Sequence, residues 1–212
     1  MAHPGGLDPS GPIALAITGA SGSAYGLRLL ELLLAAGRRV YLMISQAGQI
    51  VLRMETDLEL PARSEEAEDF LSREYRAAPG QLRVFGRQQW TAPVASGSNP
   101  PTAMVICPCT TGTLASVAAG LSGDLIERAA DVMLKEQRRL ILVVRETPFS
   151  VIHLENMLKL ARLGALILPA NPGFYYRPER VEELVDFVVA RVLDHLGVPH
   201  GLLPRWGVEP EA

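Results

Sequence analysis

The sequence predicts an α/β fold in a single domain, with helices covering both faces of a mostly parallel sheet. Short apolar runs alternate with helix-patterned stretches along the chain. A strand, a turn, a helix and a second strand fit into residues 13–44, which is the size of one parallel crossover unit. Neither an internal repeat nor an interior linker interrupts this pattern.

The predicted strands are apolar runs that are too short to be buried helices. In chain order they are residues 13–18, 39–44, 82–86, 103–107, 139–144 and 165–169. The predicted helices are a leucine-rich stretch at 27–37, a more polar region at 46–79, a small-residue stretch within 108–120, and the segments 124–136, 151–162 and 179–196. Gly37 ends the first helix, and valines and leucines form one apolar stripe along the last.

The composition is that of an ordinary globular chain: 48% of the 212 residues are hydrophobic and 20% are charged. A net charge of −3 and a pI of about 5.8 argue against nucleic-acid binding. No apolar run has the ~20 residues of a membrane span, and the N-terminus does not resemble a secretory signal. We therefore expect a cytoplasmic protein with a domain at 13–207, a disordered tail at 1–12 and a C-terminal tail at 208–212.

Ligands of parallel α/β sheets bind beyond the carboxyl ends of the strands, so the loops at that edge are the candidate site. The first of them, T-G-A-S-G-S-A-Y-G, has glycines at 19, 22 and 26. Glycines let backbone N–H groups approach a phosphate closely, although the spacing is not that of a dinucleotide-binding turn. Ser45, at the end of the second strand, also stands where an NAD site prefers a carboxylate. The alternative is a tight turn with Ser21 or Ser23 as the N-cap.

A second strand-to-helix turn, C-P-C-T-T-G-T, offers the hydroxyls of Thr110, Thr111 and Thr113 around Gly112. It predicts another loop that binds an anion or a ring. Cys107 and Cys109 are the two cysteines of the chain and do not make a disulfide framework. Because a lone C-x-C is a weak metal signal, we interpret them as small core residues.

Several charged residues have both a functional and a structural interpretation. Arg128 and Lys135 share one helical edge with Asp131, which indicates either a phosphate clamp or a solvated ion-pair edge. Arg145 and Glu146 follow a buried strand, where a carboxylate can act as general acid or base or form a local ion pair.

The remaining candidates are a cation and a group of loop aromatics. Arg191, beside an apolar stripe, reaches either an edge cavity or only solvent. Trp90, Tyr175, Tyr176 and Trp206 lie in predicted loops, although only 6% of the chain is aromatic, and they suit either a ring-binding wall or a subunit interface. We interpret His153 and His195 as structural.

Together these segments resemble the UbiX-type flavin prenyltransferases. The resemblance runs from residue 13 to the P-R-W-G at 204–207 and includes the first turn, A-M-V-I-C-P-C-T-T-G-T-L, L-I-E-R-A-A-D-V-M-L-K-E and L-P-A-N-P-G-F-Y. The block R-E-T-P-F-S-V-I-H-L-E-N-M is its most specific part. It implies a Rossmann-like three-layer sandwich in a homo-oligomer, commonly a dodecamer.

The resemblance also implies the reaction. A dimethylallyl group passes from dimethylallyl monophosphate to N5 and C6 of reduced FMN, without a metal. The product, prenylated FMN, serves a UbiD-type decarboxylase in ubiquinone synthesis or aromatic acid metabolism. The absence of paired Asp clusters agrees with a monophosphate donor that needs no Mg²⁺.

Residue roles follow from the resemblance by position. The implied FMN contacts are Gly19, Ala20, Ser21, Ser45, Thr110, Thr111, Gly112, Thr113 and Arg145. Glu146 matches the acid or base that assists phosphate departure, and Ser21 a group near flavin N5. The implied contacts to the prenyl donor are Lys135, Tyr175 and Arg191, with Trp90 and Trp206 as aromatic walls. Arg128 and Glu55 match residues contributed across subunits.

Three other functions compete with this interpretation. A flavin-dependent oxidative decarboxylase of cysteinyl compounds would share the fold, but the R-E-T-P-F-S block and the pair Tyr175 and Arg191 favour prenyl transfer. An NAD(P) reductase is disfavoured by Ser45 and by the glycine spacing. A non-catalytic flavin carrier would have no need of Glu146, Lys135 and Arg191 together.

Overall fold

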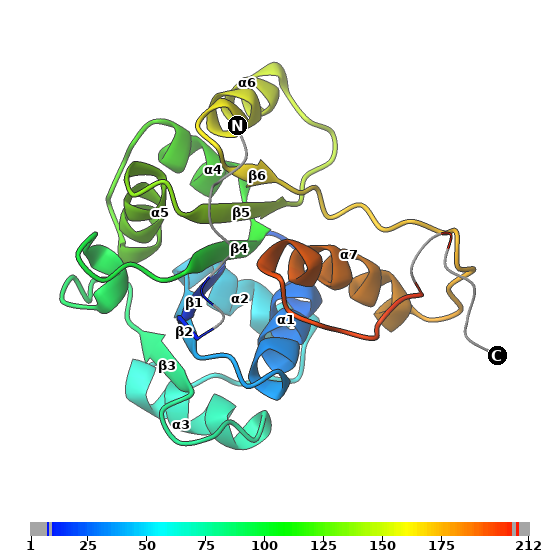
Figure 1. Ribbon diagram of the computed structural model, residues 1–212, viewed down its shortest axis with the longest axis horizontal. Coiled ribbons are helices and arrows are strands. Elements are labelled where there is room, and N and C mark those ends of the chain that lie inside the picture. Colours follow the sequence, from blue (N-terminus) through cyan, green and yellow to red (C-terminus); the bar gives the residue numbers. More distant parts are fainter. Residues whose placement is uncertain (1–7, 9, 205–206, 208–212) are drawn as a thin grey trace.

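A six-stranded, all-parallel sheet forms the centre of the protein (Figure 1). The computed structural model describes residues 8, 10–204 and 207. The strands are β1 (Ile13–Ile17), β2 (Val40–Ile44), β3 (Leu82–Phe85), β4 (Ala103–Cys109), β5 (Arg139–Val144) and β6 (Leu166–Ile167). The helices are α1 (Ser23–Ala35), α2 (Gln46–Glu55), α3 (Ser64–Glu74), α4 (Thr111–Ala118), α5 (Leu125–Lys135), α6 (Val151–Arg162) and α7 (Val181–Leu196), with a 3₁₀ turn at Pro93–Ala95.

The strand order is β3-β2-β1-β4-β5-β6, so the chain reverses its direction of travel across the sheet between β1 and β4. Such a reversal opens a crevice beyond the strand ends, which is where ligands bind in sheets of this kind. The predicted α/β class is confirmed, and the sheet is parallel throughout its described strands.

Two apolar clusters cover the two faces of the sheet and give the molecule three layers. Side chains of α1, α2, α3 and α7 pack on one face, and those of α4, α5 and α6 pack on the other. The alternation of strand side chains explains the division: Leu15 and Val105 belong to the first cluster, and Ala16 and Ile106 to the second. No helix among the described residues is long and apolar enough to cross a membrane.

Three predicted elements need correction. The region 46–79 is two helices, because the chain leaves the helix at Thr56 and Pro61 then favours extended backbone before α3. β4 continues through Pro108 to Cys109 instead of ending at Cys107. The first helix begins at Ser23, and its N-cap is Gly22 at φ 108°, neither Ser21 nor Ser23.

The end of the predicted N-terminal tail is held against the domain. Arg38 donates to the carbonyl oxygen of Gly11 at 3.1 Å, and the Thr102 backbone N–H donates to that of Pro12 at 2.9 Å. The proposed domain boundaries stay a prediction.

Candidate active site

The loops after β1 and β4 are joined by one buried side chain. The Thr18 hydroxyl donates to the carbonyl oxygen of Pro108 at 2.8 Å and accepts from the Thr110 backbone N–H at 2.9 Å. Thr18 is 1% exposed, so water does not compete for these hydrogen bonds. The two loops predicted to bind the cofactor therefore have a fixed separation at the point where the strand order reverses.

Two helix N-termini point into the same region. Ser45 caps α2 by accepting from the Gly48 backbone N–H at 3.0 Å, and Thr110 caps α4 by accepting from Thr113 N–H at 3.0 Å. Each N-terminus carries a partial positive charge and backbone N–H groups without helical partners. Their convergence makes this edge of the sheet suitable for an anion such as a phosphate.

A hollow of about 340 Å³ lies between these helix ends. It contains five of the predicted FMN contacts: Gly19, Ser45, Thr110, Gly112 and Thr113. Its other lining residues were not predicted: Thr18, Gln46, Ala47, Arg87, Ser116, Asp124 and Glu127. They come from five separate segments, and local sequence patterns do not reveal such an assembly. Arg87 contacts Asp124 at 3.5 Å, which leaves this side of the hollow with charges of both signs.

Gly19 is required by close packing. A Cβ atom at this position would lie 2.4 Å from the Cβ of Ala47, so any side chain would push α2 away from the loop after β1. Ala20, the next predicted contact, is 4% exposed. The backbone of this loop, rather than long side chains, therefore faces the hollow.

Glu146, the predicted acid or base, and Arg145, a predicted FMN contact, follow the neighbouring strand, β5. Glu146 accepts from the Thr111 hydroxyl at 3.4 Å and from the Thr147 backbone N–H at 3.1 Å. The Arg145 Nε donates to the carbonyl oxygen of Ser21 at 3.1 Å. The two residues do not form an ion pair with each other; each instead contacts one of the predicted FMN loops.

Glu55, at the end of α2, binds the N-terminus of α1 in its own chain. Its carboxylate accepts from the backbone N–H groups of Gly22 at 3.0 Å and Ser23 at 2.8 Å. Burial raises the pKa of this carboxyl, but hydrogen bonds from the Ser21 hydroxyl and from these N–H groups outweigh that effect and lower the pKa. Glu55 thus supplies the N-terminal cap that no side chain of the turn provides.

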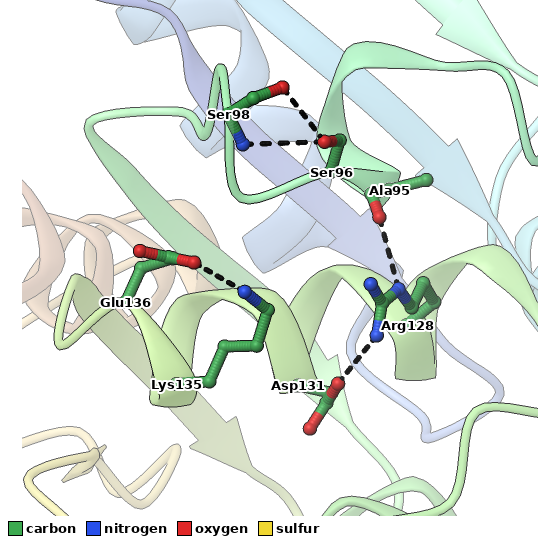
Figure 2. Close-up of polar contacts among 7 residues, drawn as sticks. All are labelled: Ala95, Ser96, Ser98, Arg128, Asp131, Lys135 and Glu136. Atoms are coloured by element: carbon green, nitrogen blue, oxygen red, sulfur yellow. Dashed lines mark hydrogen bonds and ion pairs between the residues drawn. The ribbon is translucent and has the colours of Figure 1, made fainter.

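Arg128 lies in the first turns of α5, next to the hollow-lining Glu127, and Lys135 is the last residue of the same helix. Figure 2 shows their polar contacts. Arg128 donates to the carbonyl oxygen of Ala95 at 3.0 Å and pairs with Asp131 at 2.8 Å. Lys135 pairs with Glu136 beside the loop that carries Ser96 and Ser98. Both cations therefore have local carboxylate partners. Arg128 pairs with Asp131 as the ion-pair interpretation of this helix expects, whereas the partner of Lys135 is Glu136.

Lys135 is remote from Glu146 within one chain. Lys135 lies before the first residue of β5 and Glu146 after its last, and the six residues of β5 span about 20 Å at ~3.3 Å per residue. Lys135 therefore lies toward the amino ends of the strands, and Glu146 lies at their carboxyl ends.

Tyr175 and Arg191 lie in a third region, separate from the hollow at the strand ends and from Lys135 on α5. They line a hollow of about 470 Å³ together with Tyr176, Phe187 and His200. Arg191 lies on α7, which packs on the sheet face opposite to α5, and it pairs with Asp194 at 2.6 Å. One chain therefore separates the predicted donor-binding residues into two groups on different faces.

The predicted loop aromatics that the structure describes are largely exposed. Trp90 is 46% exposed and Tyr175 76%. The Tyr176 hydroxyl donates to the carbonyl oxygen of Pro204 at 3.0 Å. Trp206 lies outside the described residues.

Both cysteines are free and buried, as expected for core residues. Burial raises the pKa of both thiols, that of Cys109 to about 12. Among the described residues, no three His, Cys, Asp or Glu side chains are grouped as metal ligands. His153 has the structural role predicted for it, because it and Ser150 form a capping box at the start of α6.

Comparison with known proteins identifies the family of this chain. The sequence model of the flavoprotein family matches residues 3–193. The flavin prenyltransferase UbiX of Pseudomonas aeruginosa is 62% identical over 93% of this chain and 96% of its own length. UbiX of Halalkalibacterium halodurans is 47% identical over 94% of this chain and 95% of its own.

Solved structures give the same result. AnUbiX (PadA1), crystallised with FMN and dimethylallyl pyrophosphate, has a TM-score of 0.83 and 36% identity, covering 95% of this chain and 100% of that one. A dodecameric FMN-dependent UbiX-like decarboxylase from Escherichia coli has a TM-score of 0.81 and 35% identity, covering 93% and 100%. The chain therefore belongs to the flavoprotein family and, within it, to the UbiX flavin prenyltransferases.

Proposed function

We propose that this protein transfers the dimethylallyl group of dimethylallyl monophosphate to N5 and C6 of reduced FMN. The 62% identity to a flavin prenyltransferase over nearly the whole chain carries this proposal. The hollow at the reversal between β1 and β4 supports it independently, because it combines two helix N-termini with threonine hydroxyls at the expected ligand-binding edge.

The residues around this hollow fit FMN. The N-termini of α2 and α4 suit its phosphate, and the bare backbone at Gly19 lets N–H groups approach closely. The hydroxyl of Thr113, which accepts from that of Thr110, provides a further donor. When bound, reduced FMN supplies the electron-rich ring to which the prenyl group is attached.

Glu146 is the proposed acid and base. The carboxyl can give a proton to the departing phosphate and afterwards accept one from the flavin. Its hydrogen bonds to Thr111 and Thr147 hold it beside the proposed FMN loop. Ser21, whose carbonyl oxygen accepts from Arg145 Nε, is proposed to lie near flavin N5.

The phosphate of the donor needs cations, because charge develops on it as the C–O bond breaks. Lys135, Arg128, Arg191 and Tyr175 are proposed to bind it. Within one chain these residues lie on different faces of the sheet, so we place them around one ligand only where several copies meet. A homo-oligomer, and specifically a dodecamer, is therefore part of the proposal; Trp90 and Trp206 would line its prenyl-binding space.

Anaerobic incubation with reduced FMN and a prenyl donor tests this function. Mass spectrometry of the extracted flavin should show the gain of one five-carbon unit with dimethylallyl monophosphate. Tightly bound but unmodified FMN, under conditions where the Pseudomonas aeruginosa relative works, would refute the function. A parallel arm with dimethylallyl pyrophosphate tests the donor, and we expect slower transfer from it.

The use of the product is a further part of the proposal. Prenylated FMN would pass to a UbiD-type decarboxylase, and apo-decarboxylase should gain activity when the reaction mixture is added. A cytoplasmic location is supported by the two free thiols of the chain.

A further inference from the structure

Helix α6 has an apolar outer face that nothing in the described chain covers. Figure 1 shows α6 at the margin of the molecule, with β6 and α4 on its inner side. Met157 and Leu160 pack inward against the sheet. Five large apolar side chains of α6 and its C-cap residue are between 51% and 69% exposed: Val151, Ile152, Leu154, Leu158 and Leu163. An apolar group of this size on a soluble protein marks an interaction site.

The charges on the same face are ordered along the helix. Glu155 lies in the second turn of α6 and Arg162 is its last residue, two turns later, and both are exposed with Leu158 between them. With Lys159 and Leu163 they line a shallow hollow of about 450 Å³. Within the part of the chain that the structure describes, neither Glu155 nor Arg162 forms an ion pair.

The order of Glu155, Leu158 and Arg162 along α6 allows two antiparallel copies of the helix to match each other. If two copies of α6 pack antiparallel about an axis near Leu158, Glu155 of each copy faces Arg162 of the other. The same register brings the two Leu158 side chains together. An isologous two-fold interface requires this kind of reciprocal match.

We propose that α6 forms a two-fold interface with α6 of a second copy of this chain. A closed dodecamer with dihedral or tetrahedral symmetry contains two-fold axes, so such a contact is compatible with the assembly proposed above. The inference rests on that homo-oligomer and not on the prenyl-transfer chemistry.

A single introduced cysteine tests the contact. The native cysteines are buried, so Leu158→Cys adds one accessible thiol near the expected axis. A short bis-maleimide should link two copies of this variant within the intact oligomer, at a yield that dilution does not lower. Glu74→Cys, exposed on α3 beneath the other face of the sheet, is the matched control and should not link. Equal yields for the two variants would overturn the proposal.

A charge exchange tests the register. Glu155→Arg and Arg162→Glu should each shift the mass measured by light scattering toward smaller multiples of 22.9 kDa. The double variant restores both ion pairs and should restore the larger species. The proposed register is wrong if the single variants assemble normally or if the double variant assembles no better than they do. Absence of prenyl transfer by the unmodified protein, with an intact Leu158→Cys crosslink, would instead count against the proposed function and leave the interface standing.

Discussion

Replacing Glu146 by glutamine should abolish most prenyl transfer while leaving FMN bound. The amide has the shape of the carboxyl, and its oxygen can still accept from the Thr111 hydroxyl and the Thr147 backbone N–H. It cannot exchange a proton with the phosphate or the flavin. Positioned acid-base groups contribute about 100- to 10,000-fold to rate, which is roughly 3–5 kcal/mol at 1.36 kcal/mol per factor of ten.

The assay for Glu146→Gln is single-turnover formation of prenylated FMN under anaerobic conditions, measured by mass spectrometry beside the dissociation constant of FMN. Glu65→Gln is the matched control, because Glu65 is exposed in the first turn of α3, away from the proposed site. We expect normal transfer from the control. Unchanged transfer by Glu146→Gln with FMN bound would refute the assigned role of this carboxyl.

Three further changes test parts of the site separately. Glu55→Gln should destabilise the protein at neutral pH by about 0.5–1 kcal/mol, because the ionised carboxylate caps α1. Since the pKa of Glu55 is lowered by folding, its contribution is present above the ordinary value of 4.5 and is lost as the pH falls through the lower folded-state value; urea unfolding at fixed protein concentration should show the two proteins converging in acid. Gly26→Ala places a Cβ 2.4 Å from a carbonyl oxygen of β4 and should cost about 1–3 kcal/mol, whereas Gly112→Ala, with 3.8 Å of clearance, should fold normally in the same thermal scan. Arg145→Lys removes the Nε donor to Ser21 and should weaken FMN binding roughly tenfold by fluorescence titration, and unchanged affinity would show that this contact does not shape the site.

Much of the fold could be predicted from local pattern. The run of apolar residues 139–144 is β5 in full, and 39–44 differs from β2 by one residue. The loops after β1, β2, β4 and β5 contain the predicted FMN contacts because parallel strands end at one edge of the sheet. The split between α2 and α3 does have a local signal, because Pro61 ends a helical pattern before it, and the prediction of one helical region at 46–79 did not use it.

The sequence by itself determined the α/β class, the strands and the identity of the loops at the binding edge, because these depend on periodicity and turn residues within short stretches. Only the tertiary structure decided which distant groups meet. Thr18 reaches Pro108 across 90 residues, and Glu55 caps a helix that begins more than thirty residues earlier. The structure also places Lys135 and Arg191 on opposite sheet faces. Such relations follow from strand order and packing, which no local repeat of the backbone encodes.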